Sequence, residues 1–248
     1  MKSKVLIIHP GFSKTGTSSF QEILRTLNVN ILAKPCENQH RTSWFKLFKS
    51  HLYSGKNQKP YNYYELKKNF KDYLKSFFNN QKTVSVFSDE GILGPITEGT
   101  IEVNNLYIFN EIIKEVENEL DIKITIKLVF TIRKQYNCIT SSFYFWEKFH
   151  KTISIKEFYE KVIKFKDYRN LFDYTFTIKK IIEILNSEVL ILPLELLEKD
   201  QKKYIHEFCK FININMSEIK INEKIHENKN YVLKSSTNRP RSLFVSLV

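Results

Sequence analysis

The residues best suited to chemistry in this chain form a loop rich in glycine and hydroxyl groups close to the first residue. Residues 9–19 read His-Pro-Gly-Phe-Ser-Lys-Thr-Gly-Thr-Ser-Ser and follow the apolar run 5–8. Apolar residues then recur from residue 20 to 27 at the spacing of an amphipathic helix. A strand, a turn and a helix N-terminus present free N–H groups and the positive end of a dipole to an anion. We therefore predict that this loop binds phosphate through Lys14, Thr15, Gly16, Thr17, Ser18 and Ser19.

A second candidate anion site follows a strand that alternation predicts over residues 123–132. Arg133 stands at the carboxyl end of that strand, and Ser141 lies eight positions later on a predicted helix. A guanidinium group can contact phosphate with two N–H groups, and a hydroxyl can add another donor. Either residue alone would more often be an ordinary surface group, so their joint spacing is the useful signal.

The predicted elements alternate between strands and helices along the chain. Strands are expected at 5–8, 29–32, 83–88, 123–132 and 188–192. Helices are expected at 20–27, 43–53, 64–79, 106–120, 137–149, 155–165, 172–185 and 201–211. This pattern predicts an α/β fold whose mostly parallel central sheet is flanked by helices on both faces.

Because ligands bind at the carboxyl ends of such strands, His9, Asp89, Glu90 and Arg133 should gather at one edge. His9 itself, on an apolar strand, is expected to be a buried core residue.

Two regions lie outside this scheme, although the whole chain, 1–248, is expected to form a single domain. Region 33–82 mixes aromatic residues with lysines. It is either an acceptor-binding helical insertion or a pair of core helices with extended lysines, and the sequence leaves both open. Region 213–248 is a polar, irregular tail, whose Lys234, Arg239 and Arg241 either close over a phosphate or belong to a disordered segment.

Composition sets limits on the class of protein. The 248 residues carry a formal net charge of +12, with 42% hydrophobic and 14% aromatic residues. A packed globular domain with anionic ligands or partners is expected, although a generally basic surface would give the same charge. Cys36, Cys138 and Cys209 match no metal-binding spacing and favour a reducing compartment. We find no signal peptide and no run of membrane-spanning length, so the expected location is cytoplasmic, without a membrane span.

The order of residues in the loop distinguishes it from the common ATP-binding loop. In that motif the lysine follows the second glycine, whereas Lys14 precedes Gly16. The order Lys-Thr-Gly-Thr-Ser resembles the 5′-phosphosulfate loop of sulfotransferases that use 3′-phosphoadenosine 5′-phosphosulfate (PAPS). Residues 9–21 are similar to the His-x-Gly-x-x-Lys-Thr-Gly-Thr-Thr-Ser-x-Gln opening of many bacterial members. The pair Arg133 and Ser141 resembles the 3′-phosphate site of the family. A weaker likeness covers 189–197 and 209–212, while 33–82 and the tail match nothing.

The resemblance implies a P-loop-containing, sulfotransferase-like fold and an enzyme that transfers a sulfuryl group from PAPS to a hydroxyl, with a carbohydrate as the expected acceptor. Lys14 would stabilise the leaving oxygen, and no metal is required. Glu90 would be the general base, as in glycan-directed members. Asp89 is an alternative base, and small-molecule members use histidine, for which His40 and His51 are candidates.

Two other functions remain open on sequence grounds. One is a P-loop-type kinase, against which the displaced lysine and the lack of an obvious magnesium-binding aspartate argue. The other is a non-catalytic basic protein that binds glycan or nucleic acid. No motif that reads RNA or DNA occurs in the sequence, so a nucleic-acid partner is not expected.

Overall fold

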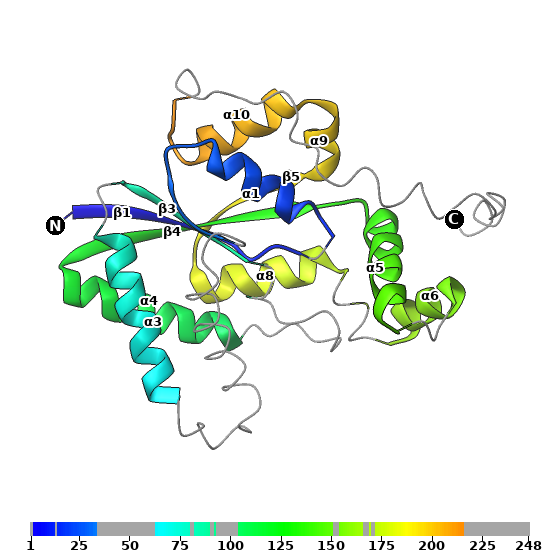
Figure 1. The fold of residues 1–248 in the computed structure, drawn as a ribbon, viewed down its shortest axis with the longest axis horizontal. Coiled ribbons are helices and arrows are strands. Elements are labelled where there is room, and N and C mark those ends of the chain that lie inside the picture. Colours follow the sequence, from blue (N-terminus) through cyan, green and yellow to red (C-terminus); the bar gives the residue numbers. More distant parts are fainter. Residues whose placement is uncertain are drawn as a thin grey trace.

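Five parallel strands form the centre of the molecule (Figure 1). The computed structural model describes residues 2–12, 14–33, 63–79, 82–89, 92, 104–150, 154–165, 169 and 172–215. The strands are β1 (Lys2–His9), β2 (Asn30–Ala33), β3 (Val84–Ser88), β4 (Ile122–Ile132) and β5 (Glu188–Pro193), in the order β2-β3-β1-β4-β5. Every neighbouring pair is parallel. The predicted parallel sheet is therefore confirmed.

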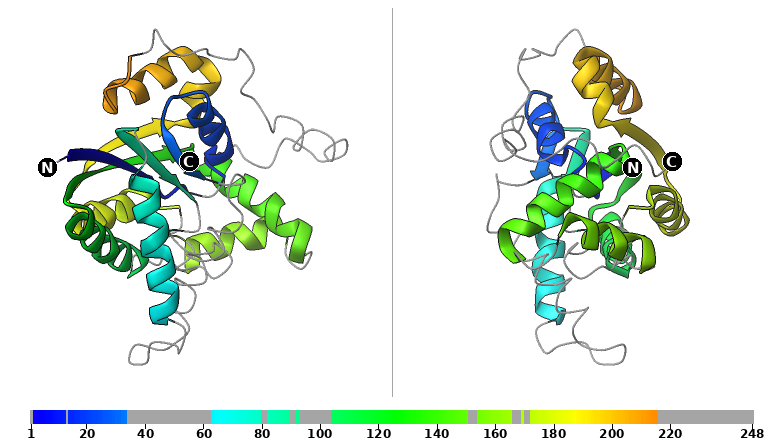
Figure 2. Two further views of the ribbon diagram at one scale, coloured as in Figure 1. Left: turned by 60° about the vertical axis from the view of Figure 1, so that its left-hand side comes forward. Right: turned by 90° about the vertical axis from the view of Figure 1, so that its right-hand side faces the viewer.

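Helices cover both faces of the sheet, as predicted (Figures 1 and 2). One face packs against α1 (Thr17–Arg25), α9 (Leu194–Lys199) and α10 (Gln201–Phe211). The other face packs against α3 (Tyr63–Phe78), α4 (Asn104–Leu120) and α8 (Tyr174–Leu185). Successive strand residues point to opposite faces, so Ile7 joins the first core while Leu6 and Ile8 join the second. Both faces of the sheet are covered at β1, which explains why residues 5–8 read as a continuous apolar run.

The remaining helices, α5 (Gln135–His150) and α6 (Ile155–Lys164), form a smaller unit beyond the carboxyl end of β4 (Figure 1). Their own apolar cluster contains Cys138, Phe143, Phe158, Val162 and Phe172. Because α5 begins directly after β4, this unit extends the molecule at the edge of the sheet where ligands are expected to bind.

Acidic or hydroxyl caps mark the beginnings of three helices. Ser154 and Glu157 form a reciprocal capping box at the start of α6. Asp173 accepts a hydrogen bond from Phe176 N at 3.0 Å, and Asp200 accepts one from Lys203 N at 2.9 Å. These side chains accept hydrogen bonds from backbone N–H groups that have no partner within the first turn of a helix.

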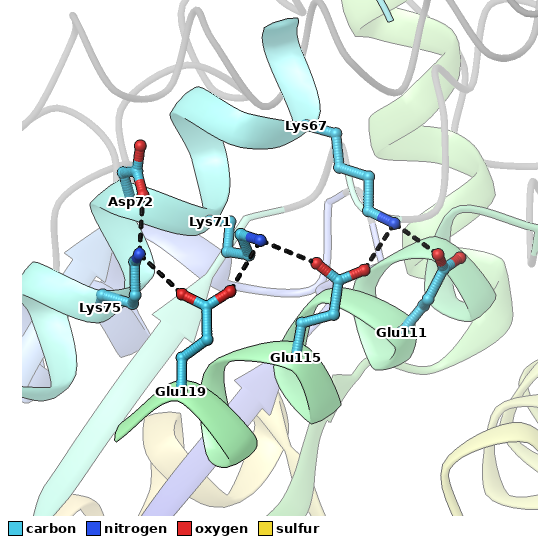
Figure 3. A network of polar contacts seen from close by, with 7 residues as sticks. All are labelled: Lys67, Lys71, Asp72, Lys75, Glu111, Glu115 and Glu119. Carbon is cyan, nitrogen blue, oxygen red and sulfur yellow. Dashed lines mark hydrogen bonds and ion pairs between the residues drawn. The ribbon is translucent and has the colours of Figure 1, made fainter. Parts of the chain in front are cut away.

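Helix α3 belongs to the core. Its aromatic residues Phe70, Phe77 and Phe78 are buried against the sheet and α4. Its residues Lys67, Lys71 and Lys75 pair with glutamates of α4 (Figure 3). In this half of region 33–82 the arrangement matches core packing. The predicted helix at 43–53 lies outside the described residues, and an acceptor role for the region stays a prediction.

Among the elements that the structure describes, the short helix α9 was not predicted from the sequence. Pro193 is both the last residue of β5 and the N-cap of α9, with φ of −66°. A proline cannot donate a ladder hydrogen bond, so the strand ends and a helix begins there. Across the described part of the chain, no helix is long and apolar enough to cross a membrane.

Candidate functional site

The loop between β1 and α1 has an unusual backbone conformation. Lys14 and Gly16 both have left-handed φ values, 64° and 93°. Gly16 is the N-cap of α1, and a Cβ atom there would lie 2.5 Å from Leu194 Cδ1 of α9. The backbone conformation therefore favours glycine, and a larger residue would also have to displace the end of the Leu194 side chain. The first hydrogen bond of α1 runs from Phe20 N to Gly16 O at 3.0 Å, so the preceding N–H groups face the loop.

Two of the threonine hydroxyls in the loop point into the protein. Thr15 Oγ1 donates to Phe12 O at 2.6 Å and lies 3.0 Å from Thr131 Oγ1 on β4. Thr17 Oγ1 donates to the same Phe12 carbonyl at 3.4 Å. Ser18 is exposed and Ser19 is half-buried. A bound anion would therefore meet the backbone N–H groups of the loop and the Ser18 hydroxyl more readily than the Thr15 hydroxyl.

A buried polar network connects the carboxyl ends of three strands beneath the loop. His9 Nδ1 lies 2.7 Å from Ser88 Oγ on β3, and His9 Nε2 lies 3.1 Å from Thr131 Oγ1 on β4. Gln21 of α1 donates from Nε2 to Ser88 O at 3.0 Å and to Ser88 Oγ at 3.1 Å. His9 is completely buried, and burial lowers its pKa to about 3. The prediction of a buried core histidine is confirmed.

The β4–α5 junction, which carries Arg133, lies next to the loop. Thr131 contacts Thr15, and Arg133 follows two residues later. The Tyr174 hydroxyl donates to Arg133 O at 2.9 Å, and Lys134 N donates to Glu195 Oε1 at 2.9 Å. These bonds fix the junction against α8 and α9. They also give Glu195, which lies within the weakest of the sequence matches, a defined structural role.

Helix α5 reaches back to the loop through an aromatic contact. Lys14 Nζ lies 3.7 Å from the centroid of the Phe145 ring. Phe145 is one helical turn beyond Ser141, so the two residues share a face of α5. The structure thus places Lys14, Thr15 and the helix that carries Ser141 around one region at the carboxyl edge of the sheet.

Asp89 is the one candidate base that lies within the described residues. Asp89 follows β3 and is buried, and its backbone N–H donates to His9 O at 3.1 Å. Glu90 lies outside the described residues, so its role stays a prediction, as do those of His40 and His51. Among the residues described, no group of His, Cys, Asp and Glu could hold a metal ion.

Sequence reasoning missed several residues of this site. Thr131, Ser88 and Gln21 form the buried network, and Phe145 contacts Lys14. Ser88 and Thr131 could have been noticed as hydroxyl residues near the ends of apolar strands. Nothing in the sequence alone distinguished Phe145 from the many other aromatic residues.

Comparison with known proteins supports the fold. No protein-family model and no curated protein sequence matches this chain. A sulfotransferase from Alicyclobacillus acidocaldarius has a similar structure, with a TM-score of 0.51 and 14% sequence identity over 92% of this chain and 87% of that chain. At this identity the likeness shows a shared sulfotransferase-like α/β fold, and the activity must be argued from the residues.

Two further structures are more distant. A mouse sulfotransferase complexed with PAP has a TM-score of 0.42 and 13% identity, over 90% of this chain and 61% of that chain. A deoxyadenosine kinase from M. mycoides has a TM-score of 0.40 and 16% identity, over 84% of this chain and 98% of that chain. Neither likeness is strong enough to support an argument about this protein.

Proposed function

We propose that this protein is a PAPS-dependent sulfotransferase that acts on a hydroxyl acceptor. The observation that carries the proposal is the adjacency of the loop and the β4–α5 junction, joined by the 3.0 Å contact between Thr15 Oγ1 and Thr131 Oγ1. The two segments are far apart in sequence, and each has residues suited to an anion. A nucleotide with phosphate groups at both its 5′ and 3′ positions would use both segments at once.

The residues of the two segments suit different ends of the donor. The N–H groups from Thr15 to Ser19, together with the Ser18 hydroxyl, would hold the 5′-phosphosulfate at the N-terminus of α1. Arg133 and Ser141 would hold the 3′-phosphate by charge-assisted hydrogen bonds. The left-handed conformation of Gly16 supports this assignment, because it turns the chain into the helix without a side chain in the way.

The proposed reaction is an in-line displacement at sulfur. The acceptor oxygen bonds to sulfur while the bond between sulfur and the bridging phosphate oxygen breaks, and the acceptor proton passes to Glu90. Negative charge then grows on the bridging oxygen, where the Lys14 ammonium would stabilise it. No step needs a metal ion. We propose a carbohydrate as the acceptor, because the resemblance places a carboxylate base after the equivalent strand in glycan-directed members.

Donor binding gives the first test. Adenosine 3′,5′-bisphosphate at 100 times its dissociation constant should stabilise the protein by about 2.7 kcal/mol, measured by thermal unfolding. The Arg133→Ala variant should lose this stabilisation at the same ligand concentration, whereas Lys134→Ala, which alters the neighbouring exposed lysine, should retain it. Stabilisation by ATP with magnesium alone would overturn the proposal and favour the kinase alternative.

Turnover tests the catalytic roles. Lys14→Ala should lower the rate of sulfuryl transfer from PAPS by about 10²–10³-fold, because the charge on the leaving oxygen would lose its partner. Glu90→Gln should lower the rate by about 10²-fold or more if Glu90 is the base. A retained rate in Glu90→Gln would assign that role to Asp89 or a histidine and leave the donor site unchanged.

A further inference from the structure

The Lys14 backbone has a defined conformation in the loop, and its ammonium group lies against helix α5. Its left-handed φ of 64° is uncommon for a residue with a Cβ atom. The next residue, Thr15, anchors the loop through bonds to Phe12 O and Thr131 Oγ1. The long alkyl stem of a lysine nevertheless lets the ammonium group sweep a wide volume. Contacts with the ammonium group therefore decide where it lies.

Phe145 is placed to do this. Its ring centroid lies 3.7 Å from Lys14 Nζ, well inside the range of about 6 Å over which a cation is attracted to an aromatic face. The Phe145 side chain is 41% exposed, so it is not part of the buried core. One face of the ring lies against the ammonium group of Lys14.

The ring stands on a firmly attached helix. The junction before α5 is held by the Tyr174 hydroxyl, which donates to Arg133 O, and by Glu195, which accepts from Lys134 N. The first residue of the helix adds a bond from Gln135 Nε2 to Phe172 O at 3.0 Å. Further along the helix, Cys138 and Phe143 are buried against α6. A contact with such a helix restricts the position of the Lys14 ammonium group.

We propose that Phe145 is a positioning residue for Lys14, holding its ammonium group by a cation–π contact on the side of the loop that faces α5. This inference rests on the proposed function for its catalytic consequence, although the contact itself can be tested without any nucleotide. Phe145 would act through Lys14 and would touch no reacting atom. The same helix would then contribute twice to the site, with Ser141 toward the donor and Phe145 toward the lysine one turn later.

The contact is tested first by the reactivity of Lys14. Trace acetylation with acetic anhydride, followed by peptide mass spectrometry, measures the rate at Lys14 relative to the exposed Lys134 of the same molecule. The reagent must reach Lys14 Nζ, which the contact with the ring holds in place and covers on one side. Phe145→Leu should raise the relative rate at Lys14 about two- to fivefold, whereas Phe145→Tyr should leave it unchanged.

A matched control is available on α8. Lys180 Nζ lies 4.6 Å from the Phe176 ring, so Phe176→Leu removes a similar contact away from the loop. This variant should raise acetylation at Lys180 and leave Lys14 unchanged. An unchanged Lys14 rate in Phe145→Leu, with the Lys180 control responding, would overturn the inference. Because Phe145 is partly exposed, its leucine variant should fold, which the unfolding temperature checks.

Kinetics then test the consequence for the reaction. With PAPS as donor, Phe145→Leu should lower kcat about two- to fivefold while KM for PAPS changes less than twofold, and Phe145→Tyr should restore kcat. A fall in kcat that Phe145→Tyr does not restore would contradict the cation–π role. A wild-type protein that transfers no sulfuryl group would overturn the proposed function, while the acetylation result would still decide whether Phe145 positions Lys14.

Discussion

At the scale of single residues, the centre of the site is a histidine that cannot act as an acid or base near neutral pH. His9 is completely buried between Ser88 and Thr131, and burial lowers its pKa to about 3. A neutral imidazole can accept from one hydroxyl and donate to another, whichever tautomer is present. His9 therefore aligns the ends of β1, β3 and β4, and through Thr131 it also supports Thr15 in the loop.

The buried His9 makes the free energy of unfolding depend on pH in a defined direction. The ordinary pKa of a histidine is 6.5, so between about pH 6.5 and pH 3 the unfolded chain binds a proton that the folded protein does not. Stability contributed by neutral His9 is thus lost as the pH falls through this window. From pH 7 to pH 5.5 the expected loss is about 1.3 kcal/mol from this residue alone.

Urea unfolding of the wild type and of His9→Gln at both pH values measures this contribution. All other groups are the same in both proteins, so their contributions cancel in the difference. The glutamine variant should be less stable at pH 7 but should lose about 1.3 kcal/mol less than the wild type on acidification. Equal losses in the two proteins would show that His9 does not titrate between the folded and unfolded states.

At the scale of elements, α3 and α4 are joined by a ladder of charges along their exposed edge (Figure 3). Lys67 pairs with Glu111 and Glu115, and Lys71 pairs with Glu115 at 3.1 Å and with Glu119 at 2.8 Å. Lys75 continues the series by pairing with Glu119 at 2.8 Å. The lysines recur every four residues, and so do the glutamates, so each set lies along one face of its helix. Part of the positive charge in region 33–82 is thereby neutralised within the protein.

The ladder should stabilise the protein weakly and in a salt-dependent way. Burial acts to lower the pKa of Lys67, but hydrogen bonds from Lys67 to Glu111 and Glu115 outweigh burial and leave the pKa raised. Lys67→Met should lower the free energy of unfolding by about 0.2–1 kcal/mol at low ionic strength, with a smaller effect in 0.5 M salt. Lys114→Met, at an exposed lysine of α4, provides the control in the same urea titrations. A loss that does not change with salt would indicate that the Lys67 stem matters through packing and not through charge.

At the scale of the whole molecule, the sheet order brings the two candidate anion sites together. Strands β1 and β4 are neighbours, although α1, β2, α3, β3 and α4 all lie between them in sequence. The loop after β1 and the junction after β4 consequently leave the same edge of the sheet side by side. The α3–α4 layer lies on one face, away from this edge (Figures 1 and 2).

A ligand that contacts both segments should protect them together. Hydrogen exchange measured by mass spectrometry, with and without adenosine 3′,5′-bisphosphate, should show slower exchange at residues 14–20 and at 133–141. Exchange in the middle of α3 and α4 should stay the same. Protection of the loop without the junction would indicate a ligand held at one phosphate only. Joint protection of both segments by ATP and magnesium would argue against a donor specific to sulfuryl transfer.

The sequence by itself determined the kind of elements and most of their limits. Strands buried on both faces and amphipathic helices leave local patterns, so the α/β class, the parallel sheet and the strand-loop-helix around Lys14 could all be predicted. The short helix α9 was missed because six residues after a proline carry too little periodicity to reveal a helix.

The tertiary structure alone decided which of these pieces meet. The strand order, the buried network of His9, Ser88 and Thr131, the charge ladder, and the contact of Lys14 with Phe145 all join residues far apart in the chain. Such pairings depend on how the helices and the sheet pack, and a local sequence pattern does not identify the distant residues that will contact it. The chemistry suggested by Lys14 was readable from its neighbours in sequence, whereas the surroundings that orient it come from β4, α5 and α9.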